Sequence, residues 1–137
     1  FVFGLHENYT SKSVLDIIKK TEDRVRYITY DSLKIRKEKD FNLEMFNALE
    51  FIKSDFFGIE IDLDALPNIA SSAMTISGFS IEELRQFVSF FGRHKNAAYM
   101  HICEGAPDLG EEKNNHLIGK LIGYLVTDFI KASTVEL

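Results

Sequence analysis

The chain lacks the features that would mark a disulfide-stabilised or membrane-spanning protein. It has one cysteine, Cys103, in 137 residues, which excludes an internal disulfide framework and suits a reducing compartment such as the cytoplasm. No apolar run approaches the roughly 20 residues of a membrane-spanning helix, and no signal peptide is visible. There are also no internal repeats and no low-complexity segments. We therefore expect a cytoplasmic protein without a membrane partner.

The chain also lacks a basic surface patch. Its 16 Lys and Arg residues are outnumbered by 21 Asp and Glu, and its most basic run, residues 34–40, is interrupted by acids. Nucleic-acid binding needs stronger clustering of positive charge, so that function is excluded. A hydrophobic content of 45% is ordinary for a globular protein, and the length suits one domain with a real core.

The first residues resemble the inside of a domain rather than its beginning. Residues 1–5, Phe-Val-Phe-Gly-Leu, have the pattern of a core strand, without an initiator Met or a polar lead-in. We expect the chain to be a fragment of a longer protein whose missing part lies upstream.

Strand and helix patterns alternate along the chain, which predicts an α/β fold with a mostly parallel sheet covered by helices. The segment 56–64 is so rich in apolar residues that we expect a strand buried on both faces. Ser80 and Glu83 form a capping box that begins a helix. In chain order, the expected elements are a strand over 1–5, a helix from about 11 to 20, a strand over 24–30, a helix from about 41 to 53, a strand over 56–63, a helix beginning at 80, a strand over 97–103 and a helix from about 115 to 131.

Carboxylates follow two of the expected strands. Asp62 and Asp64 end one strand, and Glu104 follows another. If the two strands are neighbours, three acids converge at the carboxyl edge of the sheet, where ligands bind in such folds. Because adjacent carboxylates repel each other, a divalent metal ion between them is one solution. The alternative is structural, with the Asp pair beginning a loop and Glu104 capping the turn to Pro107.

Three segments, in this order and spacing, resemble the C-terminal half of the ureohydrolase superfamily, which comprises arginase, agmatinase and formimidoylglutamase. They are Ile61-Asp62-Leu63-Asp64-Ala65-Leu66, Ser72-Ala73-Met74-Thr75-Ile76-Ser77-Gly78-Phe79-Ser80 and His101-Ile102-Cys103-Glu104-Gly105-Ala106-Pro107. The resemblance covers about residues 2–131. It implies a three-layer α/β/α arginase-like fold, with residues 1–137 forming the C-terminal half of a single domain.

The resemblance also implies a chemistry. In this superfamily two Mn²⁺ ions share a hydroxide that attacks a guanidinium or formimidoyl carbon. By resemblance, Asp62 would bridge both metals, Asp64 would ligate one of them, and Glu104 would hold the cationic substrate. Oxygen ligands suit Mn²⁺, and a metal pair makes hydroxide available near neutral pH.

The sequence departs from the superfamily pattern in two places. The usual Asp-x-Asp-x-x-Asp-Pro has Pro67 and Asn68 at its last two positions. The other metal ligands, and a His for proton transfer, belong upstream of this chain, so we expect the fragment alone to be inactive. His101 lies inside an expected strand and is read as a satisfied core or edge histidine, and Cys103 as a small buried residue without a base partner.

Alternative functions stay open. A non-catalytic arginase-fold domain could serve binding or oligomer contacts, and a flavodoxin-like regulatory domain with an acidic Mg²⁺ pocket is a third possibility that fits the segment after Leu5 poorly. Overall resemblance favours formimidoylglutamase-type proteins over true arginases, but the sequence does not choose between arginine, agmatine, formimidoylglutamate and guanidino acids. We expect a small cationic guanidino or formimidoyl substrate, and a homo-oligomer because an exposed sheet edge favours association.

Overall fold

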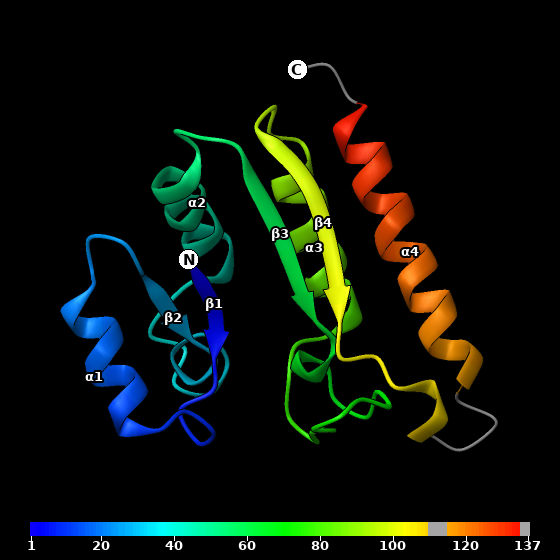
Figure 1. Cartoon of the computed structure of the whole chain (residues 1–137), viewed down its shortest axis with the longest axis horizontal. Helices are drawn as coiled ribbons and strands as arrows, with labels where there is room; N and C mark the ends of the chain where they lie inside the picture. Colours follow the sequence, from blue (N-terminus) through cyan, green and yellow to red (C-terminus); the bar gives the residue numbers. More distant parts are fainter. Residues whose placement is uncertain (110–114, 135–137) are drawn as a thin grey trace. The chain divides into compact units, whose positions relative to one another are not determined.

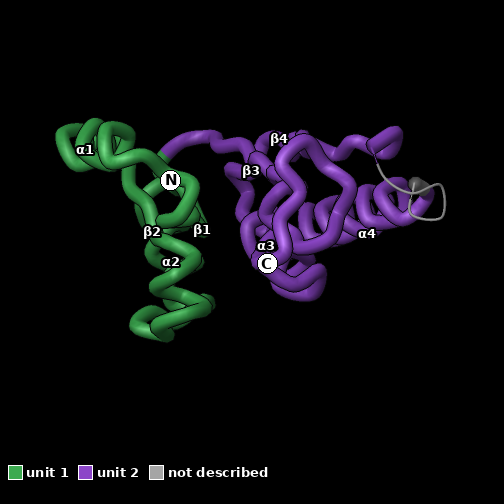
Figure 2. The backbone as a smooth tube through the Cα atoms, turned by 90° about the horizontal axis from the view of Figure 1, so that it is seen from below, with its two compact units in different colours: residues 1–54 green, residues 55–137 purple. Residues whose placement is uncertain are grey.

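The computed structural model describes residues 1–109 and 115–134. The chain divides into two compact units, Phe1–Ser54 and Asp55–Leu137, drawn in green and purple in Figure 2. Each unit contains one pair of parallel strands. Helices alternate with the strands in both units, which confirms the predicted α/β class with parallel pairing (Figure 1).

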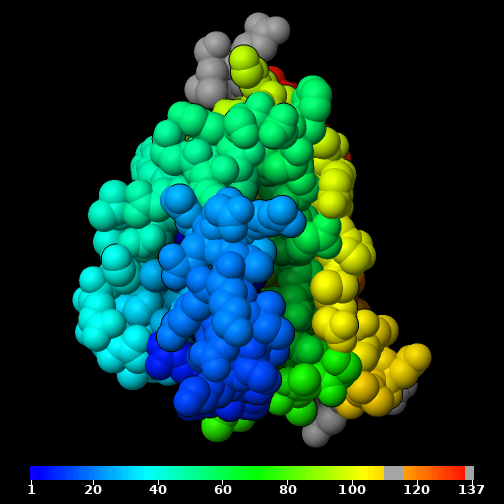
Figure 3. Space-filling model, turned by 60° about the vertical axis from the view of Figure 1, so that its left-hand side comes forward, coloured from blue at the N-terminus to red at the C-terminus, as the bar shows by residue number. Residues whose placement is uncertain are grey.

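Unit 1 follows the predicted order of strand, helix, strand and helix. Its elements are β1 (Val2–Leu5), α1 (Lys12–Lys20), β2 (Tyr27–Thr29), the π-helical turn η1 (Asp31–Ile35) and α2 (Phe41–Ile52). Side chains cap both helices, because Ser11 Oγ accepts a hydrogen bond from the Val14 amide and Asp40 from the Leu43 amide. The strand expected over 24–30 is reduced to three residues. Helix α1, in blue, lies at the surface in the space-filling view (Figure 3).

Unit 2 contains the segments that resemble the ureohydrolases. Its elements are β3 (Phe57–Asp62), the 3₁₀ turn η2 (Leu63–Ala65), α3 (Ile81–Gly92), β4 (Ala97–Cys103), the 3₁₀ turn η3 (Pro107–Leu109) and α4 (Asn115–Ser133). The predicted capping box is present, since Ser80 and Glu83 each accept a hydrogen bond from the other's backbone amide. Strand β4 has the predicted bounds.

The expectation that β3 is buried on both faces is wrong. Ile59 and Ile61 are buried. Glu60, which lies between them, and Asp62, which follows Ile61, are exposed. Helix α3 lies behind the two strands in Figure 1. Side chains alternate between the faces of a strand, so the polar residues of β3 share the opposite face with Gly58.

The core of unit 2 lies where the strands meet the two helices. Leu63, Leu66, Val88 and Leu125 are almost completely inaccessible to solvent. Helices α3 and α4 pack together, and Arg85 on α3 forms a two-pronged ion pair with Asp128 on α4, at 2.6 and 3.1 Å. This core fixes the strand ends that carry the predicted site. Among the described residues, no helix is long and apolar enough to cross a bilayer.

Candidate functional site

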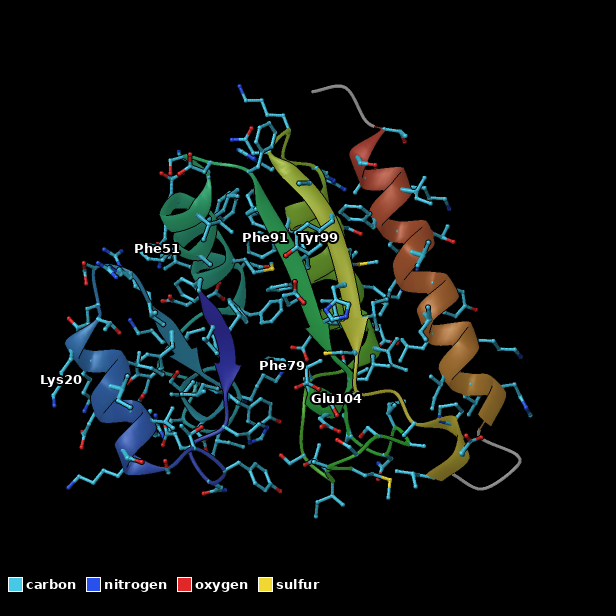
Figure 4. All side chains as sticks on the ribbon, viewed as in Figure 1. Lys20, Phe51, Phe79, Phe91, Tyr99 and Glu104 are labelled. Carbon is cyan, nitrogen blue, oxygen red and sulfur yellow. The ribbon has the colours of Figure 1, made fainter. Side chains whose placement is uncertain are left out.

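Strands β3 and β4 run parallel and end side by side. Their register pairs Glu60 with His101 and Asp62 with Cys103. The two strands are therefore neighbours, which is the arrangement that convergence of the three acids requires. Glu104 directly follows Cys103, so it lies at the same end of the strand pair as Asp62. Figure 4 shows Glu104 just past the end of β4.

Asp62 begins the turn that follows β3. Its Oδ1 accepts a hydrogen bond of 2.8 Å from the Asp64 amide and so caps η2. Its Oδ2 has no hydrogen bond within the described part of the chain. Partial burial raises the pKa of Asp62 above its ordinary value, and the charges of Asp64 and Glu104 raise it further, whereas the bond from the Asp64 amide lowers it. The ionised form of the Asp62 carboxyl is therefore disfavoured, first by partial burial and then by two neighbouring carboxylates.

Asp64 and Glu104 are connected through Ser72. The Ser72 hydroxyl lies 2.5 Å from Glu104 Oε2 and 3.4 Å from Asp64 Oδ2. The amide of the next residue, Ala73, donates to Asp64 Oδ1 at 3.1 Å. One loop segment thus contacts acids that follow two different strands. Nothing in the local sequence pattern around Ser72 indicates this contact.

Glu104 adopts a backbone conformation that is uncommon for a residue with a side chain, with a φ of 67°. The chain around it is fixed to the Ser72 loop by main-chain contacts. The Ala106 amide donates to the Ala70 carbonyl at 2.9 Å, and Ser71 and Gly105 form an antiparallel bridge. These contacts hold the turn that aims the Glu104 side chain.

The departure at Pro67 and Asn68 has a structural explanation. Asn68 has a φ of 60°, and its amide donates to the Thr75 carbonyl at 2.9 Å. A proline at position 68, as in the superfamily pattern, could neither adopt this φ nor donate this hydrogen bond. The loop therefore closes at its base in a form that the usual Asp-Pro would not permit. Gly78 ends the same loop, where an added Cβ would lie 2.3 Å from the Ala65 carbonyl oxygen.

The thiol of Cys103 lies beside this cluster but is not activated. Its Sγ donates to the Ile61 carbonyl at 3.5 Å. Desolvation raises the pKa of Cys103, and the nearby carboxylates raise it further, so the thiol stays protonated near neutral pH. This agrees with the sequence interpretation of Cys103 as a residue without nucleophilic activation, although it is partly rather than fully buried.

A row of polar side chains crosses the exposed face of β3 and β4. His101 Nδ1 lies 2.6 Å from Glu60 Oε2, and the Tyr99 hydroxyl also bonds to Glu60. Both hydrogen bonds lower the pKa of Glu60, and the bond with His101 lowers it more than the bond with Tyr99 does. Tyr99 lies over Gly58, where an added Cβ would come within 2.1 Å of the ring (Figure 4). His101 is thus hydrogen-bonded as expected, but it is exposed rather than buried.

A second polar cluster lies at the carboxyl ends of β1 and β2 in unit 1. Arg36 binds both carboxylate oxygens of Glu7, at 2.8 and 3.0 Å, and Thr29 donates to the same carboxylate at 2.8 Å. The hydrogen bonds from Arg36 and then Thr29 lower the pKa of Glu7. Next to it, His6 stacks on Tyr30 at 4.4 Å, and its buried Nε2 has no hydrogen-bond partner in the described structure.

Unit 1 also has a pocket of about 630 Å³, but none of the predicted site residues lines it. Arg26 lies over the Phe51 ring at 4.6 Å in this pocket. The guanidinium of Arg26 therefore already places a positive charge in this pocket, and we assign the pocket no function.

The acids of unit 2 suit part of a manganese site. Asp62 and Asp64 could supply the oxygen ligands that Mn²⁺ prefers, and the negative charges of Asp64 and Glu104 near Asp62 favour a cation there. Nevertheless, residues 1–109 and 115–134 contain no group of three or more His, Cys, Asp or Glu side chains that could hold a metal ion. These two carboxylates fit a share of a metal site that needs further ligands.

Comparison with solved structures identifies the fold. The chain superposes on the formimidoylglutamase from Bacillus subtilis subsp. subtilis str. 168 with a TM-score of 0.80 and 23% identity, covering 95% of this chain and 40% of that one. The Helicobacter pylori arginase gives a TM-score of 0.77 at 19% identity, covering 97% and 43%. A Trypanosoma cruzi formiminoglutamase structure with Mn²⁺ gives 0.77 at 14% identity, covering 98% and 44%.

These likenesses establish an arginase-like α/β fold, as the sequence predicted. The chain spans about two fifths of the length of the structures that it matches. No protein-family model matches the sequence, and no curated protein matches it significantly.

Proposed function

We propose that the full-length protein is a manganese-dependent ureohydrolase that hydrolyses linear amidine or guanidino C–N bonds. The observation that carries this proposal is the convergence of Asp62, Asp64 and Glu104 at one edge of a parallel strand pair, within a fold shared with formimidoylglutamase and arginase structures. Hydrogen bonds from neighbouring residues give each acid a defined position, which is not expected of acids that lie together on a surface by chance.

The three acids have separate tasks in this proposal. Asp62, with its unbonded Oδ2, and Asp64 hold the metal, and Glu104 accepts an N–H group of the cationic substrate in a charge-assisted hydrogen bond. A manganese pair, when bound, makes hydroxide available near neutral pH. The negative charge of Glu104 orients the substrate so that its amidine carbon faces the metal-binding acids.

The remaining expectations belong to the same proposal. Residues 1–137 form the C-terminal half of one arginase-like domain, the other metal ligands come from outside this chain, and the chain alone is inactive. The substrate is a small guanidino or formimidoyl cation, and the protein works as a cytoplasmic homo-oligomer. Both formimidoylglutamases and arginases are among the similar structures, so formimidoyl and guanidino substrates are both candidates.

A second candidate is a non-catalytic arginase-fold domain that serves binding or oligomerisation. One observation favours it: the loop at Asn68 excludes the usual proline. An upstream sequence without metal-ligand motifs would support this candidate.

The test compares the full-length protein with an Asp62→Ala variant. We expect two manganese ions per chain in the wild type, hydrolysis of an amidine or guanidino substrate, and loss of both metal and activity in the variant. Asp16→Ala is the matched control, because Asp16 lies exposed on α1. A wild-type protein that binds no manganese and hydrolyses none of these substrates would support the non-catalytic domain, and hydrolysis by residues 1–137 alone would contradict the fragment proposal.

A further inference from the structure

We propose that Ser72 is a positioning residue that fixes Glu104 for a planar, cationic N–H donor such as guanidinium. This rests on the proposed function, in which Glu104 binds the substrate. The carrying observation is that the Ser72 hydroxyl lies between carboxylates that follow different strands, with Glu104 at 2.5 Å and Asp64 at 3.4 Å.

The hydroxyl has one hydrogen to donate, and the two distances decide where it goes. A separation of 2.5 Å is at the short end for an O–H···O bond to a carboxylate, whereas 3.4 Å is beyond the usual range. The hydrogen is therefore directed to Glu104 Oε2. Asp64 has another donor in the Ala73 amide, at 3.1 Å, and does not depend on Ser72.

The segment around Ser72 is anchored and can hold the hydroxyl in place. Ser71 is buried, with 4% of its surface exposed, and bridges to Gly105. Ala70 accepts the Ala106 amide at 2.9 Å. These backbone contacts lie next to the Ser72–Glu104 hydrogen bond and join the same two chain segments. The backbone is thus held by its own contacts, and the Ser72 hydrogen bond orients the Glu104 side chain.

This arrangement leaves one oxygen of Glu104 for a ligand. Oε2 accepts the Ser72 hydroxyl, whereas Oε1 has no hydrogen bond within the described part of the chain. A guanidinium or amidinium group would thus donate to Oε1, with the carboxylate plane set by Ser72. Without the hydroxyl, the Glu104 carboxylate is free to rotate away from the like-charged Asp64. Substrate binding must then order the Glu104 side chain, which lowers the affinity.

The test uses the manganese-loaded full-length protein and the guanidinium ion as probe, with affinity measured by calorimetry and kcat and KM by turnover. In Ser72→Ala we expect guanidinium affinity to fall by up to about tenfold, because binding must then also order the Glu104 side chain, which Ser72 holds in place in the wild type. KM should rise by a similar factor while kcat stays within about twofold, since ground state and transition state lose the same interaction. Ser72→Thr retains the hydroxyl and should recover most of the affinity.

Ser133→Ala is the matched control, because it removes a hydroxyl that, among the described residues, bonds only to the Ile130 carbonyl on α4. Equal guanidinium affinity and KM in Ser72→Ala and the wild type would overturn the role of Ser72 and leave the proposed function intact. Loss of manganese or of folding in Ser72→Ala would also overturn it, since Ser72 would then support the structure rather than Glu104. A wild type that binds neither manganese nor guanidinium would overturn both proposals.

Discussion

Replacing Asp62 with Asn tests how much the fold disfavours the negative charge at this position. The substitution removes one negative charge but keeps an oxygen that can accept the Asp64 amide, which now bonds to Asp62 Oδ1 at 2.8 Å. Because the pKa of Asp62 is raised by partial burial and by the charges of Asp64 and Glu104, its ionised form is disfavoured in the folded chain. Without metal, we expect Asp62→Asn to be more stable than the wild type.

The expected gain is modest, because Asp62 is largely exposed and water screens the repulsion. In a water-like dielectric, each like charge at about 4–6 Å costs on the order of 0.7–1 kcal/mol before screening by salt. The weaker hydrogen bond to a neutral Asn acceptor offsets part of this gain. We expect a net stabilisation of roughly 0.5–1 kcal/mol, which raises Tm by about 2–4 °C in a chain of this size.

The assay is urea unfolding of the chain in the presence of a chelator, at several pH values. The raised pKa means that the folded state binds the Asp62 proton more tightly than the unfolded state. Wild-type stability relative to Asp62→Asn should therefore fall as pH rises from the ordinary value of 3.8 through the higher folded-state pKa, and then level off. The difference should be small near about pH 3 and complete at neutral pH.

Asp16→Asn is the control for this prediction, because it removes a charge from an exposed position on α1 and should change stability by less than about 0.5 kcal/mol. If Asp62→Asn were no more stable than Asp16→Asn at neutral pH, or if its advantage did not shrink in acid, the fold would not disfavour the ionised form of Asp62.

Two further perturbations test other parts of the structure. Gly78→Ala should destabilise the chain by about 1–3 kcal/mol in chemical unfolding, because the new Cβ would meet a backbone oxygen at 2.3 Å. The control is Gly119→Ala on α4, where nothing lies within 4 Å of the added Cβ, and it should be neutral or stabilising. Equal changes in the free energy of unfolding for the two variants would refute the close approach at Gly78. Arg36→Met should return the lowered pKa of Glu7 towards 4.5 in an NMR titration, since Arg36 is the main cause of the shift. The stabilisation from this pair should be present above pH 4.5 and be lost as pH falls through the lower folded-state pKa, and an unchanged Glu7 titration would contradict the ion pair.

Local sequence signals located most elements because their causes are local. The bounds of β4 follow from its apolar run, and α3 begins at Ser80 because a Ser and a Glu three residues apart satisfy the first amides of a helix. The double burial expected for β3 was wrong because Glu60 interrupts the apolar run. Its alternation with Ile59 and Ile61 already indicated one exposed face.

The sequence could not reveal features that depend on distant contacts. Ser72 contacts Glu104 across 32 residues of chain, and no local spacing pattern predicts such a bond. The positive φ of Glu104 has no signal either, because the turn around it is imposed by Ala70 and Ser71 rather than by a glycine. The π-helical turn over Asp31–Ile35 also lacks a distinctive apolar period. The roles of Asp62, Asp64 and Glu104 remain predictions.

The left-handed backbone at Glu104 has a consequence for how this chain can evolve. A residue with a side chain held at a φ of 67° loses on the order of 1 kcal/mol or more to strain, which glycine would avoid. Selection for thermal robustness alone would therefore favour Gly at position 104 and would eliminate the acid. If Glu104 has the proposed role in substrate binding, lineages under selection for activity should retain this glutamate although the backbone does not favour it, and lineages released from that selection should drift towards glycine.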